Sequence, residues 1–148
     1  MSSSPHFHPA YLETHFRQEH PFLNWPEEFA IITAFATTGE TWTVEQNESA
    51  DRALEDELQA SGRCYQRLTG YSPTTGHAEP GWAVEMTLSD ACDLGLRYLQ
   101  HAIYFVSGDE LRVILCVEPR EWFLIGRFRE RLQYGPVFTG ISSSTECV

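Results

Sequence analysis

Two capped helical segments, each lying between runs of strand character, constrain this chain more than any other feature of its sequence. Thr43-Val-Glu-Gln46 forms a capping box that opens a helix, and Gly62 stands where such a helix ends. Thr87-Leu-Ser-Asp90 predicts the start of a second helix in the same way. Apolar or alternating runs predict strands at residues 29–35, 63–69, 82–86, 102–106 and 111–117. The two helices and the strands at 29–35, 63–69, 82–86 and 102–106 then follow the split βαβ order.

This order predicts a single α+β domain: a mainly antiparallel sheet with helices packed on one face. We expect a ferredoxin-like order plus an extra hairpin strand, with Ser107-Gly-Asp-Glu110 as the hairpin turn. Pro9–Gln18 predicts a short helix before the sheet. Residues 118–134 fit either a cover for the open face or an edge. We expect the domain at residues 9–135, between an N-terminal tail at 1–8 and a C-terminal tail at 136–148.

The charge of the chain limits its chemistry and its partners. It carries 21 acidic and 10 basic residues, for a net charge of -11, and every basic residue is arginine. The absence of lysine excludes Schiff-base chemistry and a phosphate-loop lysine. The negative charge disfavours nucleic acid and anionic membranes as partners. A late cluster of arginines (Arg120, Arg127, Arg129 and Arg131) favours pairing with acids of the first long helix, with an anionic ligand as the alternative. Those acids are Asp51, Glu55, Asp56 and Glu57.

The sequence predicts a cytoplasmic protein without metal or cofactor. Its first nine residues carry neither a basic region nor an apolar run, and no apolar stretch is long enough to span a membrane. The four cysteines form no CxxC pair, so we expect reduced, buried thiols and no cysteine-based zinc site. His6-Phe-His8 lacks the carboxylate or thiolate spacing of a structured metal site.

A segment rich in glycine, proline and hydroxyl residues, Gly70–Gly81, predicts a long loop with functional residues. His77 and Glu79 are two residues apart, so in extended backbone both side chains leave the same face. A carboxylate beside an imidazole suits general-base work or ligand binding. The alternative is that both side chains only bind the loop to backbone groups. The letters His-Ala-Glu-Pro resemble part of a zinc deaminase motif, but no Pro-Cys-x-x-Cys follows.

Three further polar residues are candidates for the same site. Asn47 falls on one line with Leu54 and Leu58, at i, i+7 and i+11, so it points inward at the start of the helix. An inward amide requires a hydrogen-bond partner, which is either a neighbouring backbone group or a ligand. Thr33 at the end of a strand and Gln100 at the end of the second helix are the other two. An ordinary strand residue and a helix cap are their structural alternatives.

At these same residues the sequence resembles a small bacterial family known only as a domain of unknown function, over about residues 9–117. The shared pattern joins Ile32-Thr33-Ala34, Gln46-Asn47, spaced leucines ending in Gly62, Gly70–Pro73, Gly76–Pro80, Leu94-Gly95 and Gln100–Tyr104. This chain departs from the pattern where relatives have Trp-Asn-Pro, at Phe35-Ala36-Thr37, and where they have aspartate, at Ser72. The resemblance implies no known activity.

Two functions remain open from the sequence, and no motif assigns a reaction to either. The first is a pocket for a small-molecule or nucleotide-like ligand, formed by Thr33, Asn47, His77, Glu79 and Gln100. The second is an acidic interaction or regulatory module that binds a basic protein partner without catalysis, supported by the net charge of -11.

Overall fold

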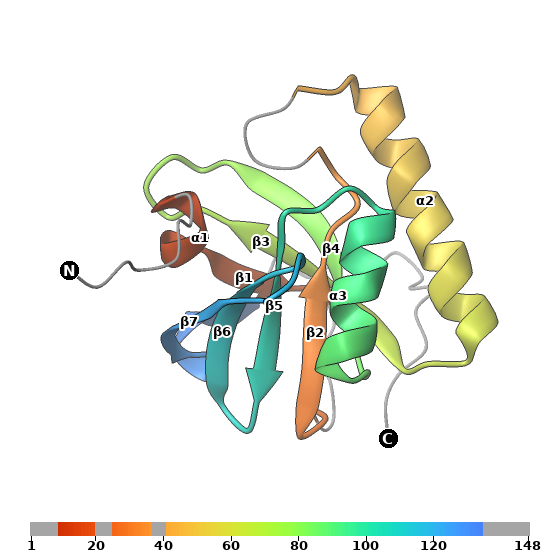
Figure 1. The fold of residues 1–148 in the computed structure, drawn as a ribbon. Helices are drawn as coiled ribbons and strands as arrows, with labels where there is room; N and C mark the ends of the chain where they lie inside the picture. The colour runs from red at the N-terminus through yellow and green to blue at the C-terminus, as the bar shows by residue number, and fades with distance from the viewer. Residues whose placement is uncertain (1–8, 20–24, 37–40, 135–148) are drawn as a thin grey trace.

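The computed structural model describes residues 9–19, 25–36 and 41–134, which form a curled, half-barrel sheet with three α-helices (Figure 1). The helices are Pro9–Glu13 (α1), Val44–Ser61 (α2) and Leu88–Arg97 (α3), with a 3-10 turn at Arg129–Arg131 (η1). The strands are His15–Gln18 (β1), Glu28–Ile32 (β2), Tyr65–Tyr71 (β3), Ala78–Val84 (β4), Ala102–Ser107 (β5), Glu110–Leu115 (β6), Trp122–Arg127 (β7) and Leu132–Tyr134 (β8). Their order in the sheet is β7-β6-β5-β2-β4-β3-β1-β8, and only the β1–β8 pair among these strands is parallel.

The predicted α+β class and mainly antiparallel sheet are confirmed. The predicted split βαβ elements supply the four central strands, in the order β5-β2-β4-β3. Two strands extend the sheet beyond β5 and two more beyond β3, so a ferredoxin-like order is not shown for the sheet as a whole. The expected tails at 1–8 and 136–148 lie outside the described residues.

Helix α2 begins and ends where its caps predict. The Thr43 side chain accepts a hydrogen bond from the Gln46 amide, and the Gln46 side chain accepts one from the Thr43 amide. Gly62 follows the helix with a φ of 72°, a left-handed conformation that glycine adopts without steric cost. Leu54 and Leu58 are buried, as their spacing predicts.

Helix α3 lies close against the sheet because Gly95 has no side chain. A Cβ atom at this position would come within 2.8 Å of Cys116 Sγ and 2.9 Å of Ile103 Cγ2. Real Cβ atoms do not approach other heavy atoms this closely, so any larger residue would push the helix outward. Gly95 therefore sets how closely α3 approaches the sheet.

The predicted helix at Pro9–Gln18 is only half correct. Helix α1 ends at Glu13, and His15–Gln18 is strand β1, which pairs with β3. Phe16 and Gln18 are buried while His15 and Arg17 are half-buried, the period-two pattern of a strand. The segment at 118–134, for which the sequence left two alternatives, forms the edge strand β7, the η1 turn and β8 at the opposite edge.

The sheet has a hydrophobic core on each face. Helices α2 and α3 cover one face, where residues such as Leu54, Trp82 and Ile103 pack together. On the other face Phe128 contacts both Phe16 of β1 and Phe29 of β2, with ring centroids 5.8 and 5.1 Å apart. These two strands are separated by β4 and β3 in the sheet, so the contacts require the sheet to curl around this second core.

Arg131 links the two ends of the curled sheet. Its guanidinium donates hydrogen bonds to the carbonyl oxygens of Leu12 and Thr14, beside β1, and of Ile125 in β7, at 2.9–3.0 Å. A guanidinium carries five donors in a fixed plane, which allows it to satisfy three carbonyls at once. Arg131 therefore stabilises the fold through hydrogen bonds to backbone carbonyls, and not through an ion pair with an acidic residue of α2.

The predicted pairing of the late arginines with α2 is wrong. Arg120 lies 2.7 Å from Asp93 of α3, and Arg127 and Arg129 lie 3.8 and 4.0 Å from Asp109 in the β5–β6 turn. Arg120 lies beside α3, and Arg127 and Arg129 lie at the end of β7 beside the β5–β6 turn, so each meets an acid of a neighbouring element other than α2. In α2, Asp51 pairs instead with Arg67 of β3, and Glu57 pairs with Arg97 of α3.

Two of the cysteines fit the expectation of buried thiols. Cys92 and Cys116 are free and buried. Cys64 is disulfide-bonded, so the expectation of reduced thiols is wrong for this residue. Cys147 lies outside the described residues. No helix in the described part of the chain has both the length and the hydropathy needed to cross a bilayer.

A polar network fastens α2 to the sheet. Arg67 and Asp51 form two hydrogen bonds of 2.7 and 2.9 Å, and their side chains are only 22% and 13% exposed. The Trp82 indole donates a further hydrogen bond to Asp51 at 3.1 Å, and the Arg67 guanidinium stacks 3.7 Å from the Trp82 ring centroid. Each member satisfies the others, so all three can lie where water has little access.

We predict that Asp51→Asn destabilises the protein by about 1–3 kcal/mol, because it removes the charge that Arg67 requires in a half-buried site. Glu48→Gln is the matched control, since Glu48 is an exposed acid on the same helix. Urea denaturation measures both changes. Equal stability of the two variants would contradict a structural role for the Asp51–Arg67–Trp82 network.

Candidate functional site

The segment that follows β2 is held in place by polar side chains from three parts of the fold. The Thr33 hydroxyl donates a hydrogen bond to the Pro80 carbonyl of β4 at 2.9 Å and accepts one from the Phe35 amide at 3.0 Å. Strand β2 ends at Ile32, so these bonds replace the ladder bonds that residues 33–35 do not make. Thr33 is therefore more than an ordinary strand residue.

Asn47 and Gln100 complete this arrangement. The Asn47 side chain accepts a hydrogen bond from the Ala36 amide at 2.8 Å, reaching across from the first turn of α2. Gln100 is buried, and its amide nitrogen donates to the carbonyl oxygens of Phe35 and Tyr98 at 2.7 and 3.1 Å. We refer to Thr33, Asn47 and Gln100 as the β2 clamp. Each of them bonds backbone, which was the structural alternative for Asn47.

The predicted loop at Gly70–Gly81 is shorter than the sequence suggests. Strands β3 and β4 extend to Tyr71 and from Ala78, which leaves 72–77 as the turn between them. The Ser72 hydroxyl accepts hydrogen bonds from the Thr74 and Thr75 amides at 3.3 and 3.1 Å. Aspartate and, more weakly, serine stabilise turns through such side-chain to backbone bonds, so Ser72 has a structural role in this turn.

His77 and Glu79 form the predicted pair beside this turn. His77 Nε2 lies 3.1 Å from Glu79 Oε2, as expected for side chains two residues apart in extended backbone. The two side chains differ in exposure: 71% for His77 and 30% for Glu79. Glu79 is thus the more enclosed member, and His77 lies at the solvent edge.

A pocket opens next to this pair, and its lining includes residues from the cores on both faces of the sheet. Its cavity volume is about 110 Å³. Most of the lining is apolar or aromatic, and the polar groups come from separate elements of the chain. The described lining residues are Tyr11, Thr14, Phe16, Ile31, Ile32, Thr33, Leu68, Gly70, Tyr71, Ser72, His77, Glu79, Gly81, Gln100, Ala102, Ile103 and Tyr104. We call this cavity the Tyr104 pocket.

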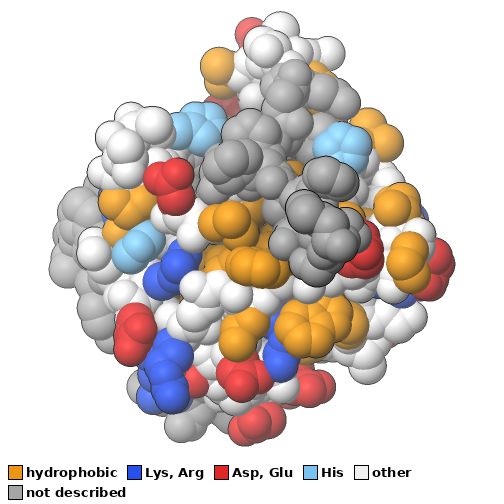
Figure 2. Space-filling model, turned by 60° about the vertical axis from the view of Figure 1, so that its left-hand side comes forward, with side chains coloured by type: hydrophobic (Ala, Val, Ile, Leu, Met, Phe, Trp, Pro, Cys, Tyr) orange, Lys and Arg blue, Asp and Glu red, His pale blue; other side chains and the backbone are white. Residues whose placement is uncertain are grey.

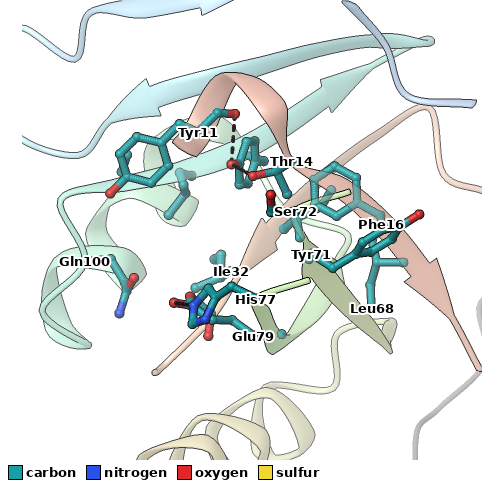
Figure 3. Close-up of a pocket in the computed structure, with 17 residues that line it drawn as sticks. Tyr11, Thr14, Phe16, Ile32, Leu68, Tyr71, Ser72, His77, Glu79 and Gln100 are labelled. Carbon is teal, nitrogen blue, oxygen red and sulfur yellow. Dashed lines mark hydrogen bonds and ion pairs between the residues drawn. The ribbon is translucent and has the colours of Figure 1, made fainter. Parts of the chain in front are cut away.

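Figure 3 shows how the labelled side chains surround this space. Tyr11 and Gln100 lie on one side of it, Tyr71 and Phe16 lie on the other, and His77 and Glu79 lie together at its lower edge. In the space-filling view of Figure 2, hydrophobic side chains gather near the centre of one face, with histidine and charged side chains around them. An apolar cavity with a few polar groups at its edge is the usual form of a small-molecule site.

Tyr104 is the central polar group of the pocket wall. Its hydroxyl lies 2.7 Å from the Thr14 hydroxyl and 3.1 Å from the Tyr11 carbonyl. Burial raises the pKa of the Tyr104 hydroxyl well above its ordinary value, so the phenol stays protonated and acts as a hydrogen-bond donor. Burial also lowers the pKa of the nearby His15 imidazole, with Arg131 as a second cause.

Four of the five sequence-predicted site residues, Thr33, His77, Glu79 and Gln100, line the Tyr104 pocket. The fifth, Asn47, does not line it and contacts Ala36 instead. Sequence reasoning missed the aromatic lining, Tyr11, Phe16, Tyr71 and Tyr104. The alternation of residues in His15–Gln18 was the one sequence signal for a strand that includes Phe16. The prediction of a helix over 9–18 left this signal unused.

The described residues contain no group of three or more histidine, cysteine or acidic side chains that could hold a metal ion. His6 and His8 lie outside this part of the chain. What the described arrangement offers is a small, largely apolar cavity with an imidazole–carboxylate pair at its edge.

An α+β half-barrel with a pocket at one end describes the architecture, and comparison with known proteins adds the family. Residues 32–103 match the model of a family described as "Protein of unknown function (DUF3293)". This match confirms, over these residues, the resemblance to a family of unknown function that is seen in the sequence. The matched region contains the β2 clamp and the His77–Glu79 pair. No curated protein and no solved structure gives a significant match to the chain.

We predict that Asn47→Ala lowers the free energy of unfolding by about 0.5–1.5 kcal/mol, because the Ala36 amide loses its hydrogen-bond acceptor. Gln59→Ala is the control, since Gln59 is an exposed amide near the other end of α2. Thermal and urea denaturation measure the difference. An Asn47→Ala variant as stable as Gln59→Ala would show that the amide of Asn47 holds nothing in place.

Proposed function

We propose that this protein binds a small molecule in the Tyr104 pocket, with the polar end of the ligand at His77 and Glu79. The observation that supports this most strongly is that four polar residues singled out in the sequence line one apolar cavity, although they come from different elements. Polar groups that converge on an apolar pocket fix the orientation of a ligand.

The size of the cavity limits the ligand. A dry apolar cavity of roughly 150 Å³ accommodates benzene, so the smaller volume of about 110 Å³ limits the enclosed part of a ligand to at most one small ring or a compact branched group. A whole nucleotide exceeds this volume, which leaves only a ring-sized part of such a ligand inside. The remainder would lie at the open edge, near the exposed side chain of His77.

The chemistry at the edge is that of hydrogen bonding and proton exchange. Glu79 accepts hydrogen bonds, and His77 accepts or donates one according to its tautomer. Among the described residues that line the pocket, we find no nucleophile held by a general base. The proposal therefore stops at binding and assigns no reaction.

A second candidate is an acidic interaction module that binds a basic protein. The net charge of -11 and the absence of lysine support it. A partner held by exposed charges is released at high salt, because ions screen such contacts. Affinity purification from the native host at low and high ionic strength tests this candidate: recovery of a stoichiometric basic partner at low salt alone favours it, and recovery of none excludes it.

The binding proposal predicts that small ring compounds stabilise the protein, and that His77→Ala removes much of this effect without changing the melting temperature of the free protein. The unchanged melting temperature follows from the 71% exposure of the His77 side chain. A ligand present at about 100 times its dissociation constant adds about 2.7 kcal/mol to stability, which thermal denaturation detects.

His101→Ala is the matched control, because His101 is exposed and does not line the pocket. The screen uses monocyclic compounds of positive, neutral and negative charge. The proposal fails if no compound stabilises the protein. It also fails if His77→Ala and His101→Ala respond to every stabilising compound as the unmodified chain does.

A further inference from the structure

The Tyr104 pocket carries four aromatic rings in a small space. Tyr11, Phe16, Tyr71 and Tyr104 all line it. Tyr11 and Phe16 both meet the Tyr104 ring edge to face, with centroid distances of 6.3 and 5.2 Å and interplanar angles of 74° and 85°. Edge-to-face contacts orient neighbouring rings at steep angles, so the pocket presents π faces as well as edges. The face of an aromatic ring carries negative potential and attracts cations.

The charged side chain of the pocket lining is negative, as is the potential at the face of an aromatic ring. Glu79 is the one carboxylate among the described residues that line the pocket, and none of them is arginine. The whole chain contains no lysine and has a net charge of -11; the guanidinium groups beside the lining are those of Arg17, against the Tyr71 ring, and Arg131, on the Thr14 carbonyl. Glu79 Oε2 contacts His77, while its other carboxylate oxygen accepts no hydrogen bond from the described residues.

Two rings of this protein, one of them in the pocket lining, have a guanidinium group close to their centroid. The Arg17 guanidinium lies 4.7 Å from the centroid of the Tyr71 ring, and that of Arg67 lies 3.7 Å from the Trp82 ring. Tyr71 is thus both a lining residue of the pocket and a ring with a cation held against it. These contacts lie within the distance at which cation–π attraction acts.

We propose that the Tyr104 pocket selects a compact organic cation, of the class of methylated ammonium groups, over neutral molecules of the same shape. This inference rests on the proposed binding function and adds the chemical class of the ligand. Aromatic faces attract a methylated ammonium group whose charge is spread over its methyl groups, and Glu79 supplies the counter-charge. A trimethylammonium group is a compact branched group of the kind that the volume of about 110 Å³ admits.

The test compares choline with 3,3-dimethylbutan-1-ol, in which a carbon atom replaces the nitrogen and the charge is lost. The full chain is titrated with each compound, and amide chemical shifts report both affinity and location. We expect choline to bind about tenfold more tightly than the alcohol, the ratio that a cation–π and counter-charge advantage of this type produces. The shift changes should centre on Gly70, Tyr71 and Tyr104.

Two variants separate the contributions of charge and rings. Glu79→Gln should weaken choline binding several-fold and leave the alcohol unaffected, since the amide keeps the shape and removes the charge. Tyr71→Leu should act in the same direction, because it keeps an apolar side chain and removes the ring. Glu110→Gln is the matched control: Glu110 pairs with Arg112 two residues away in β6, as Glu79 pairs with His77, and lies outside the pocket.

The outcomes distinguish this inference from the function on which it rests. Equal affinity for the two compounds, with no response to Glu79→Gln, overturns the cation preference and leaves the pocket as a binding site. Shift changes confined to residues outside the pocket overturn the preference as well. If choline and the alcohol both fail to bind, the inference is wrong, and the screen with monocyclic compounds decides the proposed function separately.

Discussion

The structure depends on how the chain is held where it leaves the central strand β2. Residues 33–36 follow this strand without a ladder partner, and buried backbone groups are costly unless they are hydrogen-bonded. The β2 clamp supplies these bonds: Thr33 binds β4, Asn47 reaches from α2, and Gln100 reaches from the connection between α3 and β5. The same contacts bring both long helices and the β3–β4 hairpin to one end of the sheet. The Tyr104 pocket lies at that end, so its wall exists because this segment is fixed.

Local signals in the sequence predicted those parts of the fold that local interactions determine. Both helix starts, the left-handed glycine after α2 and the turn between β5 and β6 follow from short-range hydrogen bonds and backbone conformation. Strand β1 could not be predicted in this way, because its pairing partner β3 lies some fifty residues away in the chain. The pairing of Arg67 with Asp51 is also non-local. The only sign of this ion pair in the sequence is that Asp51 follows Asn47 by four residues and so lies on the inward side of the helix.

In the candidate site too, some residues could be predicted from local features of the sequence and others could not. Thr33, His77, Glu79 and Gln100 were predicted from residue type and position, and they line one pocket. The backbone partners of Thr33 and Gln100 came from the structure alone, since these partners meet only when the sheet is assembled. The aromatic side of the pocket was not predicted at all. Tyr11 and Tyr71 reach it because the sheet curls, and curvature of a sheet leaves no pattern in a single strand.

The most direct test of this account is hydrogen exchange at the Ala36 amide, measured by NMR in the native protein. Ala36 lies outside every strand and helix, and Asn47 alone among the described residues accepts its N–H. We expect protection comparable to that of amides in β2, and loss of this protection in an Asn47→Ala variant that still folds. Exchange at the rate of an open loop in the unmodified chain would contradict it, because residues 33–36 would then not be fixed and could not form a pocket wall.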